Sequence, residues 1–383
     1  MQDMVQDVVK ARYGAGAQER EDALCCPVDY DPQYLKIIPE EVIERDYGCG
    51  DPSQYVREGE TVLDLGSGTG KICFIASQVV GPEGKVIGID MTDEMLDVAR
   101  RNAPIVAERT GYANVEFRRG HIEDLATDLT EMDRRLAETP LSSASALADF
   151  EKARAKQRAT APLVEDNSVD VIVSNCVLNL VSDTDKPALF REMFRVLKKG
   201  GRIAISDIVS DETSPEHLKS DDDLWSGCIS GALQEHEFVA LLEEVGFYGI
   251  TLDKRESAPW QVVDGIEYRS VTVLAWKGKE GPCWDKNEAV IYKGPFFSVA
   301  DDDGHTYLRG QPMAVCEKTY KILTSEPYAP NFYAVPAQTE VAEQIPFDCT
   351  RDALRAPSET KAGVAPTTRI NEDPCCAPET DCC

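Results

Sequence analysis

The chain of 383 residues is long enough for two or three folding units. Its net charge of −28 would repel phosphate groups, which excludes nucleic acid and anionic membranes as expected partners. It contains no apolar run long enough for a membrane helix, and residues 1–14 lack the pattern of a secretion signal. We therefore expect a cytoplasmic protein.

Short apolar strands alternate with amphipathic helices through the first half of the chain, after a helical and loop-like segment over residues 1–50. Strands are predicted at 61–66, 85–90, 114–125, 168–180 and 202–209. Helices are predicted between them at 71–80, 92–111 and 186–201. This alternation predicts an α/β, Rossmann-like domain over 51–210, with a mostly parallel sheet and helices on both faces.

Four further regions depart from this pattern. Residues 128–165 are expected to be a surface insertion, either a helical hairpin or a partly disordered segment. Residues 211–280 hold an insert after the fifth strand and strands that close one sheet edge. A small α+β module is predicted over 281–352, and the Pro- and Ala-rich residues 353–383 are expected to be disordered.

The stretch DLGSGTG, residues 64–70, joins the first predicted strand to a helix. Its glycines allow a ligand to approach the backbone closely, and the helix N-terminus offers free N–H groups. The spacing G-x-G-x-G differs from the dinucleotide pattern G-x-G-x-x-G, and no Gly-Lys-Ser/Thr follows, so it is not a P-loop.

An acid before G-x-G-x-G resembles the Rossmann-like S-adenosylmethionine methyltransferases. The resemblance implies that Asp90, at the end of the second strand, binds the ribose hydroxyls, and that residues after the second, third and fourth strands line the same crevice. The cofactor-binding residues expected on this basis are Asp64, Gly66, Ser67, Gly68, Gly70, Asp90, Met91, Ile122, Glu123 and Asn175.

Four of the thirteen cysteines stand near these elements. Cys176 follows the fourth strand, and ligands of open α/β sheets bind at the carboxyl ends of the strands. Cys73 begins the helix after the glycine loop, where a helix N-terminus favours a thiolate. Cys228 lies in a Ser/Gly-flanked loop after the fifth strand, and Cys49 precedes the first.

The motifs YGCG, DLGSGTGKIC, IGIDMT, SNCVLNL and SGCISGAL together resemble the arsenite S-adenosylmethionine methyltransferases, over about residues 29–275. KTYKILTSEPY in the C-terminal module also resembles them. The insertion and the Cys-Cys pairs of the tail depart from the family, but neither interrupts a motif.

The resemblance implies detoxification by methyl transfer from S-adenosylmethionine to trivalent arsenic, whose natural ligands are thiolates. Cys176 and Cys228 are the expected arsenic ligands, with Cys73 as a third. Cys49 and Cys73 are expected to serve redox steps, with thioredoxin or glutathione as the reductant. The arsenic lone pair attacks the methyl group, so no general base is needed. A monomer is expected.

Two other functions fit parts of the pattern. A methyltransferase for an organic molecule such as a quinone or sterol shares the fold and the cofactor, but it gives the cysteines no role. A non-catalytic metalloid-sequestering protein explains the cysteine total and leaves the glycine loop unused. The vicinal pairs 25–26, 375–376 and 382–383 are either arsenic-delivery thiols or merely exposed.

Overall fold

The computed structural model describes residues 2–19, 21, 28, 30–45, 47–350 and 352–362. They fall into two units, Met1–Gly246 with Ile250–Lys277, and Phe247–Gly249 with Gly278–Cys383. Among the helices of these residues, none combines the length and the apolar character that a membrane crossing requires.

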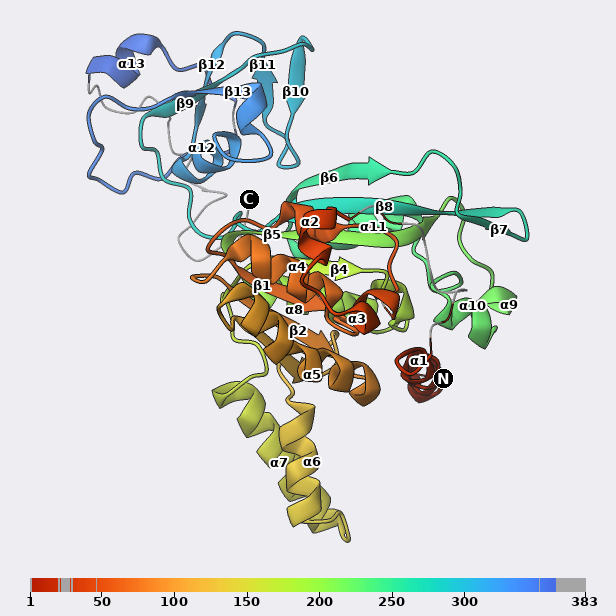
Figure 1. The fold of residues 1–383 in the computed structure, drawn as a ribbon. Helices are drawn as coiled ribbons and strands as arrows, with labels where there is room; N and C mark the ends of the chain where they lie inside the picture. Colours follow the sequence, from red (N-terminus) through yellow and green to blue (C-terminus); the bar gives the residue numbers. More distant parts are fainter. Residues whose placement is uncertain are drawn as a thin grey trace. The chain divides into compact units, whose positions relative to one another are not determined.

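The first unit is built on an eight-stranded sheet with the order β3-β2-β1-β4-β5-β8-β6, in which β7 pairs with β8 (Figure 1). Neighbours among β1 to β5 are parallel, and β8 runs antiparallel to β5. The strands are β1 Thr61–Leu65, β2 Lys85–Asp90, β3 Val115–Arg119, β4 Val169–Asn175, β5 Leu197–Ser210, β6 Tyr248–Arg255, β7 Gln261–Val263 and β8 Ile266–Trp276. The predicted α/β fold with its mostly parallel sheet is confirmed.

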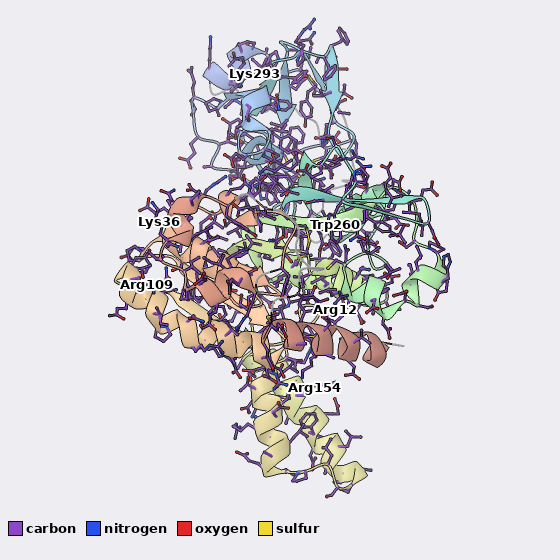
Figure 2. The ribbon with its side chains drawn as sticks, turned by 45° about the vertical axis from the view of Figure 1, so that its right-hand side comes forward. Arg12, Lys36, Arg109, Arg154, Trp260 and Lys293 are labelled. Atoms are coloured by element: carbon purple, nitrogen blue, oxygen red, sulfur yellow. A yellow bond between two sulfur atoms is a disulfide. The ribbon has the colours of Figure 1, made fainter. Side chains whose placement is uncertain are left out.

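Helices cover the sheet, and β1 and β4 at its centre are almost fully buried, as strands covered on both faces should be. The long helices are α1 Gln2–Gly16, α4 Lys71–Val80, α5 Asp93–Thr110, α8 Lys186–Val196 and α11 Glu235–Val245. The short ones are α2 Pro32–Leu35, α3 Glu40–Glu44, η2 Pro52–Tyr55, η3 Leu178–Leu180, α9 Glu216–Lys219 and α10 Asp222–Ser226. Arg12 ties α1 to α10, because its Nη1 donates to the Asp223 carbonyl and to Ser226 Oγ, both at 2.8 Å (Figure 2).

One helix ends earlier than its sequence pattern indicates. The Lys-Lys-Gly-Gly stretch predicted to end α8 lies in β5, which begins at Leu197. Gly200 N donates to the Lys277 carbonyl at 2.7 Å, and Lys277 N donates to the Gly201 carbonyl at 2.9 Å. Pairing with the chain at the end of β8 therefore outweighs the local helix signal.

The insertion is a helical hairpin of α6, Leu129–Glu138, and α7, Ala144–Thr160 (Figure 1). Backbone hydrogen bonds close its base, from Leu163 N to the Ala126 carbonyl at 3.1 Å and from Val164 N to the Leu125 carbonyl at 2.8 Å. Of the two alternatives that the sequence left open, the structure has the hairpin.

The second unit contains a three-stranded antiparallel sheet and a two-stranded hairpin. Its strands are β9 Glu288–Tyr292, β10 Ser298–Ala300, β11 Thr306–Leu308, β12 Pro312–Val315 and β13 Phe332–Val335, and its helices are α12 Glu317–Leu323, η4 Ala329–Asn331 and α13 Pro357–Ala362. Apolar side chains from β9, β12, α12 and β13 form its core.

The prediction that residues from 353 onward are disordered is wrong for 353–362. Arg355 is fully buried, and its guanidinium donates to both carboxylate oxygens of Asp285, at 2.8 and 2.9 Å. A bidentate pair of this kind is strong and geometrically specific, so it anchors a segment that has few large apolar residues. Cys375, Cys376, Cys382 and Cys383 lie outside the described residues, as do Cys25 and Cys26.

Candidate functional site

The glycine loop follows β1 and turns into α4 through three residues with left-handed backbone, Gly66, Gly68 and Gly70. A Cβ on Gly66 would lie 2.4 Å from a methyl group of Val177, so this glycine lets the loop pack against the chain after β4. A Cβ on Gly68 would meet no atom within 4 Å, so the backbone there faces open space. The loop therefore offers backbone to a ligand at its middle glycine.

Asp90, at the end of β2, fixes the loop from the side. Its carboxylate accepts hydrogen bonds from Gly68 N at 2.9 Å and from Thr92 N at 2.8 Å. Burial raises the pKa of Asp90, and these backbone donors oppose that shift.

An open cavity lies over this loop, lined by residues from the ends of β1, β2 and β4 and from α1. The expected residues that line it are Asp64, Gly66, Ser67, Gly68, Asp90, Met91, Ile122, Glu123, Asn175 and Cys176. Gly70 is not among its lining residues, since it packs beside Phe117 and Phe74 at the start of α4. Within the described residues, the buried Ser67 Oγ has no hydrogen-bond partner, so it remains available to a ligand.

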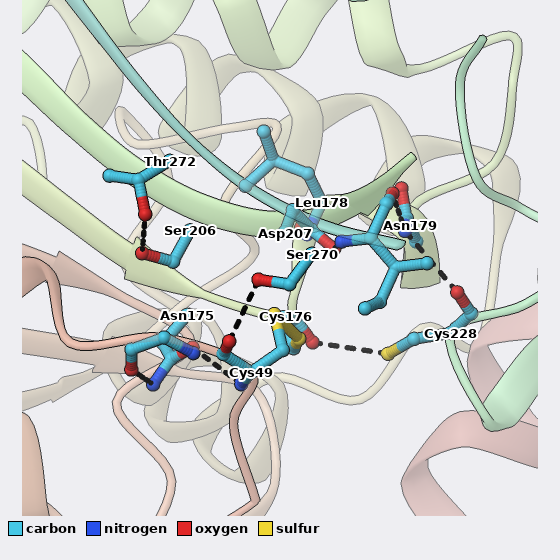
Figure 3. Close-up of a disulfide and its surroundings, with 12 residues drawn as sticks. Cys49, Asn175, Cys176, Leu178, Asn179, Ser206, Asp207, Cys228, Ser270 and Thr272 are labelled. Atoms are coloured by element: carbon cyan, nitrogen blue, oxygen red, sulfur yellow. Dashed lines mark hydrogen bonds between the residues drawn. A yellow bond between two sulfur atoms is a disulfide. The ribbon is translucent and has the colours of Figure 1, made fainter. Parts of the chain in front are cut away.

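Cys176 follows β4 at one end of this cavity and forms a disulfide with Cys49, whose Cα lies 5.9 Å away (Figure 3). Asn175 holds the Cys49 loop in place, because its Oδ1 accepts from Cys49 N at 2.9 Å and from Gly50 N at 3.1 Å. A Cβ on Gly48 would lie 2.2 Å from Asn175 Nδ2, and one on Gly50 would lie 2.5 Å from Ser206 Cβ. The glycines of YGCG thus let Cys49 reach Cys176.

Cys228 approaches the same place from the loop after α10. Its thiol donates to the Cys176 carbonyl at 3.2 Å (Figure 3). Its sulfur also lies 3.8 Å from the Tyr13 hydroxyl. Asn179 Nδ2 fixes the loop by donating to the carbonyls of Ile208 at 2.7 Å and of Cys228 at 3.3 Å. Three of the expected cysteines, at positions 49, 176 and 228, therefore share one buried cluster.

A second, smaller cavity shares the lining residues Tyr13, Tyr47 and Cys176 with the first. Its other lining residues are Ile208, Gly227, Cys228 and Trp260. Cys176 therefore borders both the cavity over the glycine loop and the smaller, aromatic-lined pocket, and Cys228 lines the smaller one.

The backbones of Cys176 and Cys228 are both left-handed, with φ of 57° and 62°. The other non-glycine residues with positive φ in the described chain are Asn167, Asp264 and Asn287, of the types that tolerate this region. A cysteine there costs roughly 1–2 kcal/mol. The surrounding contacts must offset this cost at both cysteines. Residues held in such strained conformations are common at functional sites.

Asp207 lies beneath the Cys176 loop. Its carboxylate accepts from Leu178 N at 2.9 Å and from Ile208 N at 2.8 Å, so it holds the chain two residues beyond the cysteine. Burial raises the pKa of Asp207 to about 7. No sequence pattern singled this residue out.

Cys73, expected as a third arsenic ligand, lies in a different buried cluster from the other three cysteines. Its side chain is completely buried within an apolar cluster of β1, β2, β4 and α4, and its thiol donates to Asp64 Oδ2 at 3.2 Å. It lines neither cavity. The helix does start at the carboxyl end of β1, but its first turn points this side chain down against Gly88 of β2 rather than toward the ligand side.

Several lining residues were missed by sequence reasoning. Tyr13 comes from α1, and burial followed by the nearby Cys228 raises its pKa well above the ordinary range. Gln6, also on α1, donates to Glu123 at 2.9 Å. Trp260 reaches the small pocket from the segment before β7. These residues are far from the motifs in sequence, and no local pattern marks them.

Comparisons with known proteins bear on both units. The family described as a methyltransferase domain matches residues 57–134 and 141–246, and a domain of unknown function matches residues 279–365. An arsenite methyltransferase of Aquipseudomonas alcaligenes is 34% identical over 85% of this chain and 89% of its own length. An arsenite methyltransferase of Mus musculus is 31% identical over 90% of this chain and 83% of its own.

Among solved structures, the chain is similar to an arsenic(III) S-adenosylmethionine methyltransferase from Chlamydomonas reinhardtii. The TM-score is 0.55 at 28% identity, and the match covers 82% of this chain and 99% of that one. The similarity therefore extends beyond the nucleotide-binding half of the molecule.

Proposed function

Because the chain belongs to the arsenite methyltransferases and transfers methyl groups from S-adenosylmethionine to trivalent arsenic, we propose that the two cavities bordered by Cys176 hold the two reactants next to each other. The larger cavity takes the methyl donor and the smaller pocket takes arsenic. The single observation that carries this proposal is that Cys228 Sγ lies 3.2 Å from the Cys176 carbonyl, at the boundary between the cavities.

The residues of the larger cavity fit S-adenosylmethionine. The orphaned Ser67 Oγ and the open face of Gly68 suit polar groups of the ligand, and the acceptor carboxylate of Asp90 at the cavity wall suits ribose hydroxyls. Met91 and Ile122 offer apolar contacts to a base. When bound, this cofactor supplies an electrophilic methyl group on a sulfonium.

We assign arsenic binding to Cys49, Cys176 and Cys228, with Cys49 as the third ligand in place of Cys73. Trivalent arsenic is soft and three-coordinate, so it favours three thiolates. Reduction of the Cys49–Cys176 disulfide releases two sulfurs already within bonding distance of each other, beside the third. Monomethylated arsenic(III) needs only two thiolates, for which Cys176 and Cys228 suffice.

The chain's contribution to the reaction is then to orient the substrate rather than to move a proton. Arsenic held by thiolates keeps a lone pair, so its attack on carbon releases no proton and requires no base. The left-handed backbones at Cys176 and Cys228 fix the positions of both sulfurs before the substrate arrives. Tyr13, Tyr47 and Trp260 limit access of water to the pocket.

When the protein holds the Cys49–Cys176 disulfide, a thiol reductant must break this bond before arsenic can bind. Thioredoxin or glutathione would reduce the Cys49–Cys176 bond by exchange, two reductant thiols becoming one disulfide as two cysteine thiols are released. Methyl transfer formally oxidises arsenic by two electrons, and oxidation of two thiols to a disulfide returns it to the trivalent state. The same exchange then resets the protein.

The test is an assay with reduced protein, labelled S-adenosylmethionine and arsenite, with a demethylated quinone as the alternative acceptor. We expect the labelled methyl group in methylated arsenic and none in the quinone. The variant Cys228→Ser should form no labelled arsenic product. Tyr333→Phe, on an exposed residue of the second unit, is the matched control and should leave the rate unchanged. Full methylation of arsenite by Cys228→Ser would refute the assignment.

A further inference from the structure

Three more cysteines converge in the second unit, and none of them is among the lining residues of the two cavities described above. The sulfurs of Cys283, Cys316 and Cys349 all lie within 4.8 Å of one another. The first two are almost fully buried, each with 1% of its surface exposed, and the third is half-buried. All three fall within residues 279–365, the part of the chain matched by the domain of unknown function.

Each sulfur comes from a different stretch of chain. Cys283 precedes β9, Cys316 is the N-cap of α12, and Cys349 lies in the irregular segment that leads to α13. The Cys316 sulfur accepts a hydrogen bond from Thr319 N at 3.4 Å, which fixes its direction. The backbone also joins two of the stretches, since Phe347 N donates to the Cys283 carbonyl at 2.9 Å. The cluster is therefore built by the fold and is not the result of neighbours in sequence.

The cluster has three donors and no fourth among the described residues. His305, which lines the small cavity beside Cys316 and Cys349, already uses both ring nitrogens, Nδ1 with Asp301 at 3.0 Å and Nε2 with the Cys349 carbonyl at 3.2 Å. Both nitrogens are therefore engaged within the protein and do not supply a fourth ligand. Structural zinc sites require four ligands, whereas trivalent arsenic takes three.

Charge separates these two ligands as well. Zinc bound by three thiolates forms an anion, and two of the three cysteines are almost fully buried. Burial of an anion is penalised by the loss of its hydration. Arsenic bound by three thiolates is neutral, and neutral thiols suit a buried site.

We propose that Cys283, Cys316 and Cys349 form a second binding site for trivalent arsenic, distinct from the site of methyl transfer. Arsenous acid condenses with the three thiols, so that three As–S bonds replace three As–O bonds and three water molecules leave. No electron is transferred, and no proton is gained or lost overall. The bound arsenic joins three segments of the second unit, and it therefore stabilises that unit against unfolding.

The test uses the full chain with nine of its thirteen cysteines replaced by serine. The cysteines kept are Cys73, Cys283, Cys316 and Cys349. This background lacks the proposed methyl-transfer site, so its arsenic binding is independent of the proposed function. Arsenite binding is measured by equilibrium dialysis in a phosphine reductant, and arsenic X-ray absorption counts the sulfur neighbours.

We expect one equivalent of arsenic bound to three sulfurs. Cys349→Ser, at the half-buried position, should weaken this binding by about tenfold or more, while Cys73→Ser is the matched control and should retain it. A second experiment makes Cys349→Ser in the otherwise unaltered chain, so the proposal stays testable if the serine background does not fold. This variant should bind one equivalent of arsenic fewer and keep its methylation rate. No bound arsenic, retention by Cys349→Ser, or displacement of arsenic by equimolar zinc would overturn the proposal.

Discussion

Cys73 and Cys176 both follow strands that end at the same side of the sheet, Cys73 in α4 beyond the glycine loop after β1 and Cys176 directly after β4. Cys176 lines both cavities, whereas Cys73 is completely buried in the core and bonded to Asp64. The difference lies in the backbone. Cys176 sits in a left-handed turn that aims it outward, while Cys73 is in the first turn of a regular helix. The end of a strand specifies a location, and the following turn decides whether a side chain reaches the ligand.

The largest effect is expected from replacing Cys176, the thiol that lines both cavities (the outward thiol). We expect Cys176→Ser to lower the methylation rate of arsenite by at least about 100-fold, because loss of one arsenic ligand misplaces the reacting atom. The rate is measured under reducing conditions with labelled methyl donor. Activity close to that of the unaltered protein would mean that the outward direction of Cys176 has no catalytic role.

Cys49→Ser separates binding from reduction at the outward site. Its arsenite methylation should fall by about tenfold or more, equivalent to ~1.4 kcal/mol, since one of three ligands is lost. Its methylation of monomethylated arsenic(III), which needs two thiolates, should persist.

The same variant should also perform a single turnover without any added reductant, because Cys176 can no longer be held in the disulfide. The measurement is single-turnover kinetics with and without prior reduction. Equal dependence of both proteins on the reductant would contradict this role for the disulfide.

Asp207→Asn tests the support beneath the outward thiol. Burial raises the pKa of Asp207 from 3.8 to about 7, so the folded protein keeps this proton over a range where the unfolded chain has lost it. The free energy of unfolding should therefore fall by about 1.4 kcal/mol per pH unit between pH 5 and 7 from this group alone. Urea unfolding of Asp207→Asn should lack this component, and identical pH profiles for both proteins would argue against it.

The smallest effect is expected for the inward thiol. Cys73→Ser keeps a donor to Asp64, so we expect arsenite methylation near that of the unaltered protein and a stability loss of about 1 kcal/mol. Thermal unfolding and the labelled assay measure both quantities. A loss of activity as large as that of Cys176→Ser would restore Cys73 as an arsenic ligand.

The sequence predicted the elements that depend on local patterns. The five parallel strands, the glycine loop and Asp90 follow from periodicity and motif spacing, and all lie where the topology requires. The family resemblance brought Cys49, Cys176 and Cys228 into consideration. What could not be predicted was their pairing, since Cys49 and Cys176 are 127 residues apart and meet through Asn175.

Other features depend on contacts that no short pattern reveals. The tail beyond residue 352 looked too polar to fold, but one buried ion pair, Arg355 with Asp285, fixes its first part. Cys73 was assigned to the site from its position alone, although the direction of its side chain depends on how α4 packs on β2. The cavity wall formed by α1 depends on Tyr13 and Gln6, which no motif includes.

The closed base of the α6–α7 hairpin makes this insertion a natural place to splice in a reporter. Backbone hydrogen bonds join Leu125 and Ala126 to Val164 and Leu163. The fold is therefore closed at the base of the hairpin, and its tip can accept an inserted domain. A fluorescent domain inserted between Leu141 and Ser142, both exposed, should leave arsenite methylation unchanged in the labelled assay. Such a chimera would let arsenic turnover be followed in living cells by light.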